Sequence, residues 1–222
     1  MSCIILLNQN KSNFLPTKKI IYPVETTKII GLTGGIGSGK SAVSNYLKQA
    51  GISVYDADTE AKKIMHKDPE VKAELIRVFG SGTYVDGVLQ TKVLAQKVFN
   101  DKNLLSKLNA IVHPAVRRHL KTFVEESSQP YVIVENAILY ESGFDALCDF
   151  VVCVTAPLDT RIFRVMARDG VSHAQVMARI NNQWDEADKV KRADMVITNI
   201  DWAETEPQIE ALIKRLDRQF GI

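Results

Sequence analysis

Eight residues near the start of the chain have the types and spacing of a phosphate-binding loop. Residues 34–41, GGIGSGKS, fit the pattern G-x-x-x-x-G-K-[ST]. Glycines at these positions let the backbone curl, so that successive N–H groups point inward at phosphate oxygens. Lys40 can reach the β- and γ-phosphates, and the Ser41 hydroxyl can ligate Mg²⁺. The pattern therefore predicts that this loop binds a nucleoside triphosphate.

The flanking elements decide between this interpretation and a plain glycine-rich turn. The apolar run at residues 29–32 is typical of a buried strand, and a helical pattern follows from 40 to 50, with Gly51 placed to end it. The beginning of that helix adds its positive dipole end to the loop. Because strand, loop and helix occur in the order that the motif requires, we favour phosphate binding.

A carboxylate pair follows the next strand. Residues 52–55 form a short apolar strand that ends in Asp56-Ala57-Asp58. In a parallel α/β sheet, ligands bind beyond the carboxyl ends of the strands, so these acids face the same crevice as the loop. The alternative is that Asp58 caps a helix over 59–65. The neighbouring phosphate loop favours a chemical role.

Another strand, at 131–134, ends in Glu135. An acid in this position holds the Mg²⁺ shell in many enzymes with such a loop, although any strand can end in an acid. A second acid, Glu141, follows in a loop, and residues 150–154 form a further apolar strand. Uninterrupted apolar strands are typical of a parallel sheet that is covered on both faces.

The residues between 59 and 128 are almost wholly helical in pattern. Asp68-Pro69 begins a helix that Gly80 ends, and residues 80–89 form a loop or small hairpin. Helices return at 91–99 and at 102–112, where Asp101 can cap. Pro114 is expected to open another helix, which carries the basic cluster 117–121. We expect a helical lobe that bears the second substrate's site. His113 can equally be a capping or packed residue, and the basic cluster a solvated helix face.

Two helices joined by a short turn resemble a lid over phosphates. Ala156-Pro157 opens a helix over 158–169, Gly170 ends it, and a capping box at Ser172 begins the next. Arg164 and Arg168 share a face of the first helix, and arginine binds phosphate oxygens bidentately. The alternative is a surface helix with an Arg168–Asp169 pair. A last strand at 195–198 and a helix at about 203–220 complete the chain.

The composition is that of an ordinary globular protein with one substantial α/β core. The chain has 222 residues, 45% of them hydrophobic and 24% charged, and its net charge of +2 gives no argument for nucleic acid or an anionic membrane. Three cysteines without a C-x-x-C pair favour neither a disulfide framework nor a zinc site, and so a reducing cytoplasm is expected. No apolar run reaches the length of a membrane span. Residues 1–27 are expected to be a poorly ordered extension or an upstream start, with an edge strand at 19–24 as the alternative.

An ordered set of motifs in this chain resembles the dephospho-coenzyme A kinases. The resemblance covers residues 28–222, nearly everything except the leading extension. The motifs are Gly31–Ser41, Asp56-Ala57-Asp58, His113-Pro114 with Arg117, Leu139 with Glu141, Arg164 with Arg168-Asp169, and Ala193-Asp194 leading to Asn199.

The resemblance implies a reaction and an architecture. The family transfers the γ-phosphoryl group of ATP to the ribose 3′-hydroxyl of dephospho-coenzyme A, which completes coenzyme A synthesis. The implied fold is an α/β P-loop NTPase core with a parallel five-stranded sheet, at residues 28–58 and 129–222. A helical substrate-binding lobe covers about 59–128, and a small helical lid covers about 157–190.

The resemblance also implies roles for residues. Asp58 would be the catalytic base, while Lys40, Arg164 and Arg168 would hold the transferring group. The other implied residues are the ATP-binding set Gly35, Ile36, Gly37, Ser38, Gly39, Lys40, Ser41, Ala42 and Asn199, the substrate-binding set Thr33, Asp58, His113, Arg117 and Glu141, and the magnesium set Ser41 and Glu135, in part through water.

The chain departs from the family pattern at three places. Residues 137–141, AILYE, stand where the family often has PLLFE, Ala42 replaces a common threonine, and no glycine follows Asn199. A nucleoside or nucleotide monophosphate kinase of the same core is the alternative function. A GTP-binding switch is disfavoured because no Asn-Lys-x-Asp run occurs. We expect a monomer or weak homo-oligomer without nucleic-acid or membrane partners.

Overall fold

The computed structural model describes residues 26–99 and 101–221. The predicted extension over residues 1–27, apart from Thr26 and Thr27, lies outside the described residues, as does the alternative strand at 19–24. No helix in the described part of the chain is both long enough and apolar enough to cross a bilayer.

The centre of the molecule is a parallel sheet of five strands in the order β2-β5-β1-β6-β7. This confirms the predicted five-stranded parallel sheet. Because β1 is the middle strand, the loop that follows it lies at the centre of the carboxyl edge. The strands are β1 (Lys28–Thr33), β2 (Val54–Asp56), β5 (Tyr131–Glu135), β6 (Phe150–Thr155) and β7 (Met195–Thr198).

Both faces of the sheet are covered, as the uninterrupted apolar strands predict. Successive side chains of a strand point to opposite faces, and neighbouring residues of β5 accordingly belong to different core clusters, Ile133 to one and Val134 to the other. The Ile133 face is covered by α1 (Lys40–Gln49) and α9 (Trp202–Phe220). The Val134 face packs against helices of the lobe.

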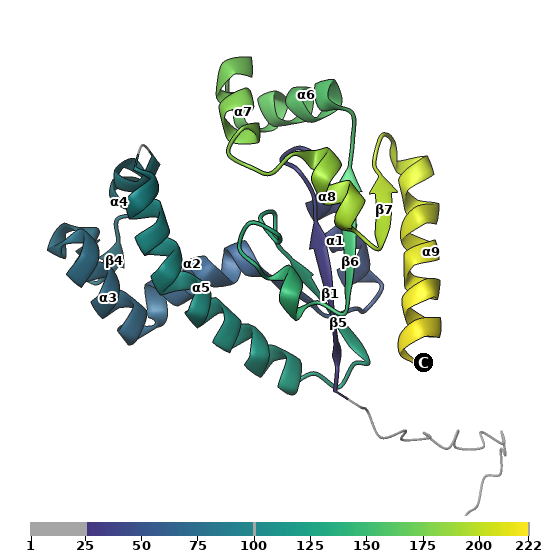
Figure 1. Ribbon diagram of the computed structural model, residues 1–222, viewed down its shortest axis with the longest axis horizontal. Coiled ribbons are helices and arrows are strands. Elements are labelled where there is room, and N and C mark those ends of the chain that lie inside the picture. Colours follow the sequence, from purple (N-terminus) through teal and green to yellow (C-terminus); the bar gives the residue numbers. More distant parts are fainter. Residues whose placement is uncertain (1–25, 100, 222) are drawn as a thin grey trace, which may run out of the picture.

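The helical lobe extends away from the sheet, on the left in Figure 1. A two-stranded hairpin, β3 (Tyr84–Val85) with β4 (Val88–Leu89), lies within it and follows the 3-10 turn η1 (Ser81–Thr83). The side chains of Asp68 and Asp101 cap α3 and α5, as predicted. The helices of the lobe are α2 (Ala57–Lys67), α3 (Pro69–Phe79), α4 (Thr91–Phe99) and α5 (Lys102–Glu125).

One prediction for the lobe is wrong. Pro114 does not open a new helix but lies inside α5, which runs without interruption from Lys102 to Glu125. Proline in a helix interior removes one backbone hydrogen bond and crowds the preceding turn. Buried residues on both sides of Pro114, among them Val112 and Val116, pack into the same core cluster. We infer that this shared core holds the two halves in one helix, because tertiary packing overrides local propensity.

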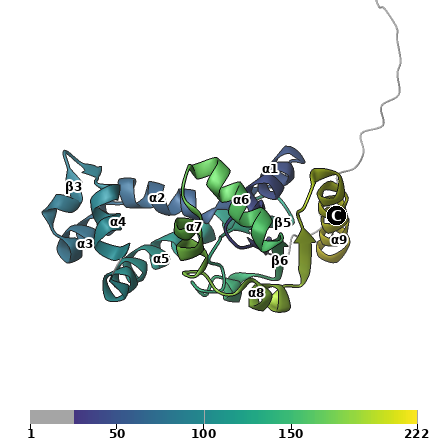
Figure 2. The same cartoon turned by 90° about the horizontal axis from the view of Figure 1, so that it is seen from above.

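Three helices lie over the carboxyl ends of the strands (Figures 1 and 2). They are α6 (Leu158–Asp169), α7 (His173–Ile180) and α8 (Glu186–Arg192). Gly170 ends α6, and the predicted capping box at Ser172 is present. A small apolar cluster that includes Val165 and Val176 packs against Ile36, and this contact joins the helices to the phosphate loop.

Candidate active site

The phosphate loop turns tightly between β1 and α1, and two residues from distant segments press directly against it. Gly37 has a φ of +81°, and a Cβ there would meet the backbone oxygen of Arg161 at 2.5 Å. Gly39 has a φ of +87°, and its Cβ would overlap the side-chain amide of Asn199. Glycine is therefore required at both positions, by backbone conformation and by close packing.

Asn199 bonds to the backbone of the phosphate loop. Its Nδ2 donates to the carbonyl of Ser38 at 2.8 Å, and its Oδ1 accepts a hydrogen bond from Thr205 Oγ1 at 3.1 Å. The side chain is buried. The ATP-binding role expected for Asn199 stays a prediction, because these bonds account for the side chain as a support of the loop backbone.

Lys40, Ser41 and Glu135 meet at the bottom of the loop. Lys40 Nζ lies 2.6 Å from Glu135 Oε1, and Ser41 Oγ donates to the same oxygen at 3.2 Å. The pair is nearly buried, with the Lys40 and Glu135 side chains 12% and 8% exposed. The parallel register of β1 and β5 produces this meeting, because it sets Leu32 opposite Glu135.

The hydroxyl oxygen of Ser41 and the carboxylate oxygens of Glu135 are also suitable ligands for Mg²⁺. The described residues contain no group of three or more His, Cys, Asp or Glu side chains that could hold a metal by themselves. Mg²⁺ usually needs no such cage, because it keeps several waters and binds one or two carboxylates together with substrate phosphates. The Ser41 hydroxyl and the Glu135 carboxylate, which already share a hydrogen bond, fit that kind of site.

Asp56, and not Asp58, caps the helix after β2. The Asp56 carboxylate accepts the Thr59 N–H at 3.0 Å and the Thr59 hydroxyl at 2.8 Å, and α2 begins at Ala57. The capping alternative for Asp58 is therefore wrong. The reason is that the helix starts at Ala57, two residues earlier than its apolar pattern indicates, so Asp58 lies inside the first turn and not at the cap position.

Asp58 lies between two cavities. The larger, here called the phosphate cavity, has a volume of about 450 Å³ and is lined by the loop, Arg164, Arg168, Ala137 and Gln183. The smaller, here called the apolar cavity, has a volume of about 170 Å³ and lies between α2, α5 and the segment after β5. Among the described residues, Asp58 alone lines both.

The surroundings of Asp58 change its acidity. Although its side chain is open to solvent, it lies in a concave site, and this partial desolvation raises the pKa of Asp58. The nearby Lys40 acts in the opposite direction, while the charges of Asp56 and Glu135 add to the increase. A carboxylate with a raised pKa is a stronger proton acceptor than an ordinary aspartate, as a general base requires.

Both apolar and polar side chains line the apolar cavity. Its walls include Val112, Val116 and Phe144, and the polar side chains Asn109, His113 and Asn136 also line it. The His113 ring lies edge-on to Phe144, with the ring centroids 6.2 Å apart. Burial lowers the pKa of His113, and the nearby Arg117 adds to that effect, so the ring is neutral at pH 7.

The lid contributes two arginines to the phosphate cavity. Arg164 donates to the carbonyls of Asn199 and Ile200 at 3.0 and 2.8 Å. Arg168 pairs with Asp169, as the surface alternative expects, with Nε 2.7 Å from Oδ1. Both arginines nevertheless line the cavity, so the pairing and the phosphate role do not exclude each other.

Three predicted substrate residues do not line either cavity. Thr33 is wholly buried, and its hydroxyl has no partner among the described residues. Glu141 is bound by Lys189 at 2.7 Å. Arg117 donates to the carbonyls of Ser142 and Gly143 and lies over the Phe144 ring. It therefore supports Phe144, which lines the apolar cavity, without lining the cavity itself.

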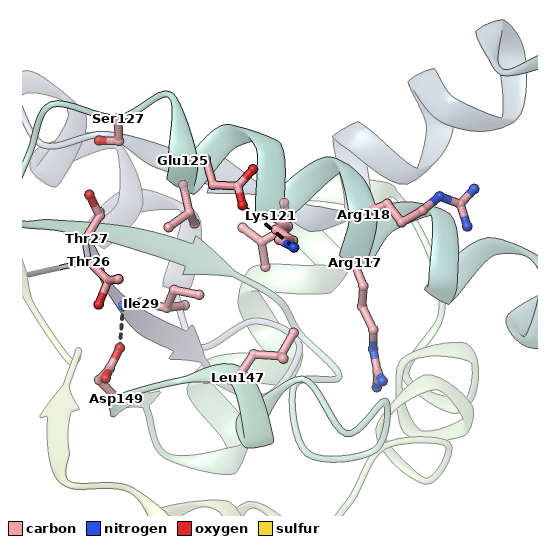
Figure 3. A pocket seen from close by; sticks show the side chains of 12 residues that line it. Thr26, Thr27, Ile29, Arg117, Arg118, Lys121, Glu125, Ser127, Leu147 and Asp149 are labelled. Atoms are coloured by element: carbon pink, nitrogen blue, oxygen red, sulfur yellow. Dashed lines mark hydrogen bonds and ion pairs between the residues drawn. The ribbon is translucent and has the colours of Figure 1, made fainter.

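Arg117 instead borders a third and larger hollow, of about 840 Å³, at the amino end of β1. Figure 3 shows Arg117 and Arg118 leaving α5 in different directions, with Lys121 turned towards Glu125. The nearby Asp149 accepts the Ile29 N–H at 2.8 Å. The hollow lies at the opposite end of β1 from the phosphate loop and contains none of the predicted catalytic residues.

Sequence reasoning missed several residues that contact the site. Gln183 accepts the N–H of Ile36 in the phosphate loop at 2.9 Å. Arg161 forms a buried ion pair with Glu186 at 2.6 Å. Glu186 and Lys189 are three positions apart in α8 and have opposite charges. This spacing draws attention to the two side chains, but it predicts an ion pair between them and not the partners that they have in the structure.

Comparison with known proteins gives consistent matches. The family model described as dephospho-CoA kinase matches residues 28–204. A dephospho-CoA kinase of Bacteroides fragilis is 40% identical over 185 residues, which are 83% of this chain and 90% of that protein. One of Geobacillus kaustophilus is 38% identical, with 86% and 98% covered.

Solved structures agree with the fold. The protein TT1252 of Thermus thermophilus is 36% identical with a TM-score of 0.78, and the match covers 89% of this chain and all of that one (100%). A dephospho-CoA kinase of Campylobacter jejuni has a TM-score of 0.64 at 24% identity, with 86% and 98% covered. At that identity the second match supports the fold alone.

Proposed function

Because the chain belongs to the dephospho-CoA kinase family, we infer that its two cavities hold the two substrates of one phosphoryl transfer. The chain is a kinase that transfers a phosphoryl group from ATP to the ribose 3′-hydroxyl of 3′-dephospho-coenzyme A. The products are coenzyme A and ADP, and the reaction is the last step of coenzyme A biosynthesis. The observation that supports our assignment of the cavities is that Asp58 lines both of them.

In this proposal the phosphate cavity binds the triphosphate of ATP. The phosphate oxygens are bound by the ammonium group of Lys40 and by backbone N–H groups of the loop other than those of Ile36 and Ser38, which donate to Gln183 and to the carbonyl of Gly35. Arg164 and Arg168 lie on the opposite wall and stabilise negative charge as it develops on the transferring group. Ser41 and Glu135 would hold Mg²⁺, which would neutralise negative charge on the phosphate groups when bound.

Asp58 is the proposed general base. Its carboxylate accepts the proton of the ribose 3′-hydroxyl while that oxygen forms a bond to the γ-phosphorus. The bond between the γ-phosphorus and its bridging oxygen breaks, and the bridging oxygen leaves as part of ADP. Little covalent chemistry is asked of the protein, so most of the acceleration comes from positioning and charge stabilisation.

The apolar cavity is the proposed site for the adenine ring of the acceptor. Its apolar walls suit the faces of a flat heterocycle, and the side chains of Asn109, His113 and Asn136 can bond its edge. An adenine bound there places the attached ribose beside Asp58. We accordingly propose that the helices of residues 59–128 form the acceptor lobe and that residues 157–190 form the lid.

A coupled assay of ADP release tests the acceptor. We expect turnover with ATP and dephospho-coenzyme A, and turnover at least two orders of magnitude lower with nucleosides and nucleoside monophosphates. Comparable rates with adenosine monophosphate would instead support the nucleotide kinase alternative. Omitting Mg²⁺ or adding a chelator should abolish ADP release, and activity that persists in chelator would contradict the proposed magnesium site.

A further inference from the structure

The segment by which the lid returns to the core, residues 183–189, contacts two different walls of the active site. We call it the lid return segment. It begins after α7, passes through Trp184 and enters α8, whose first turn contains Glu186. Two of its side chains, Gln183 and Lys189, bond to backbone groups on opposite sides of the site.

Gln183 reaches the phosphate loop. Its Oε1 accepts the N–H of Ile36 at 2.9 Å, and its side chain also lines the phosphate cavity. Each backbone amide in such a loop has to point in one direction for the loop to fit a polyphosphate. A side chain that fixes the Ile36 amide therefore limits the conformations of the whole loop.

Glu186 also acts on the phosphate loop, through Arg161. It pairs with Arg161 at 2.6 Å and accepts the Thr155 hydroxyl at 2.5 Å, and the Arg161 side chain is only 7% exposed. The backbone of Arg161 is the group that lies against Gly37. The lid return segment thus holds α6 against the phosphate loop as well.

Lys189 reaches the other wall. Its side chain is wholly buried, at 0% exposed, and Nζ lies 2.7 Å from Glu141 Oε1 and 3.0 Å from the carbonyl of Ala137. Ala137 lines the phosphate cavity, and its neighbours Asn136 and Ile138 line the apolar cavity. Lys189 therefore fixes the backbone that separates the two cavities.

The energetics argue that stability alone does not account for this lysine. Desolvating a buried ion pair costs about as much as the attraction returns, and a pair of apolar side chains in its place is often as stable or more so. A buried ion pair can instead fix the conformation of the segments that it joins, because the ammonium group has to lie within hydrogen-bond distance of its acceptors. The geometry defined here is that of residues 136–141.

We propose that the lid return segment is a positioning clamp, in which Gln183 fixes the phosphate loop for ATP and Lys189 fixes residues 136–141 for dephospho-coenzyme A. The proposal rests on the assignment of the two cavities made above. Neither residue takes part in bond making. Each sets the position of the backbone that one substrate contacts.

The clamp predicts that the two residues affect different Michaelis constants. For Gln183→Ala we expect KM for ATP to rise about three- to tenfold, the equivalent of one lost hydrogen bond, with KM for dephospho-coenzyme A unchanged. The matched control is Asn182→Ala, because Asn182 is adjacent and exposed. It should leave both constants unchanged.

For Lys189→Met we expect KM for dephospho-coenzyme A to rise about tenfold or more and kcat to fall, with KM for ATP changed less than threefold. The variant also leaves the nearly buried Glu141 carboxylate without its cation and with only the Trp184 N–H as a partner, so its melting temperature should fall. Lys191→Met is the matched control, since Lys191 is on the same helix with a side chain that is 76% exposed.

The double variant Glu141→Met/Lys189→Met separates positioning from stability. Removing both charges should recover most of the lost melting temperature, because no unpaired charge is left and only the Trp184 N–H loses its acceptor. If Lys189 is a positioning residue, KM for dephospho-coenzyme A stays high in the stabilised double variant. If that constant returns to the wild-type value with the melting temperature, the role is structural and the clamp is overturned.

Two further results would also overturn the clamp. One is an equal rise of both constants in Gln183→Ala and Lys189→Met. The other is the reversed pattern, with Gln183 affecting the acceptor and Lys189 affecting ATP, which would show in addition that the cavities are assigned the wrong way round. A failure of the proposed function is distinguishable from these results, because the wild-type chain itself would then not phosphorylate dephospho-coenzyme A.

Discussion

The phosphate cavity and the apolar cavity share Asp58, but backbone lines most of the first and side chains line the second. The first is mostly backbone, a run of consecutive residues whose glycines allow Arg161 and Asn199 to pack against it. The second consists of side chains from α2, α5 and the segment after β5, which lie far apart in the sequence. A site made of one continuous loop tolerates few substitutions and can be recognised in the sequence. A site made of dispersed side chains is found only once the fold is known.

The largest effect is expected from the single side-chain cation of the phosphate loop. Lys40→Ala should lower kcat by about 10³-fold or more, because the charge on the β- and γ-phosphates is lost in the transition state. Steady-state ADP release measures it. Lys48→Ala, on the exposed side of the same helix, should stay within about twofold of wild type. A Lys40→Ala enzyme with near-normal turnover would show that the backbone alone suffices.

Asp58→Asn tests the residue that the two cavities share. We expect kcat to fall by about 10²- to 10⁴-fold while ATP still binds, since a general base contributes about that much. The raised pKa of Asp58 means that the fold disfavours its charged form, so the amide should leave the melting temperature unchanged or raise it. Loss of ATP binding in this variant would assign Asp58 to the phosphate cavity alone.

The same residue sets the pH dependence. A base works when it is deprotonated, so kcat/KM should be full above the pKa of Asp58 and fall as the pH drops through it. Because that pKa is raised, the fall should begin at a higher pH than for an ordinary aspartate. His113 titrates in the acidic range as well, since its pKa is lowered. A His113→Gln variant that keeps the fall would attribute it to Asp58.

A smaller effect is expected where the phosphate cavity is pure backbone. Gly37→Ala should raise KM for ATP about ten- to hundredfold, because the added Cβ strains the left-handed backbone and meets the Arg161 carbonyl. Gly51→Ala is a matched control, with a φ of +86° and no atom within 4 Å of its Cβ. It carries the conformational penalty without the collision. Equal KM values in the two variants would mean that packing against the lid is unimportant.

The smallest effect should come from the side-chain cavity, where the contacts are dispersed. His113→Ala should raise KM for dephospho-coenzyme A about three- to tenfold and leave KM for ATP unchanged, since one neutral hydrogen bond is lost. His66→Ala, an exposed histidine of α2, serves as the control. If both constants rise together, the two cavities are not energetically separate, and the comparison made above fails.

The sequence predicted most of the elements because their signals are local. The phosphate loop, the five strands and the caps at Asp68, Asp101 and Ser172 each depend on residues within a few positions of one another. Of the two wrong interpretations, the cap at Asp58 was misplaced by two residues, and the helix start at Pro114 is overridden by tertiary structure. Pro114 indicates a boundary, but the core on both sides of it keeps α5 continuous.

The parts that escaped prediction are contacts between distant segments. Nothing near Gln183 indicates that its side chain meets the amide of Ile36, 147 positions earlier. Glu141 and Lys189 likewise meet only because the lid returns beside the segment that follows β5. Such pairs follow from the order of the strands and the path of the lid, which no short pattern in this chain encodes.

The contact between Lys40 and Glu135 has a consequence for how the nucleotide enters. In the proposed site a phosphate group of ATP competes with the Glu135 carboxylate for the one ammonium group, which lies 2.6 Å from Glu135 Oε1. A polyphosphate too short to draw Lys40 away from Glu135 would therefore bind only weakly.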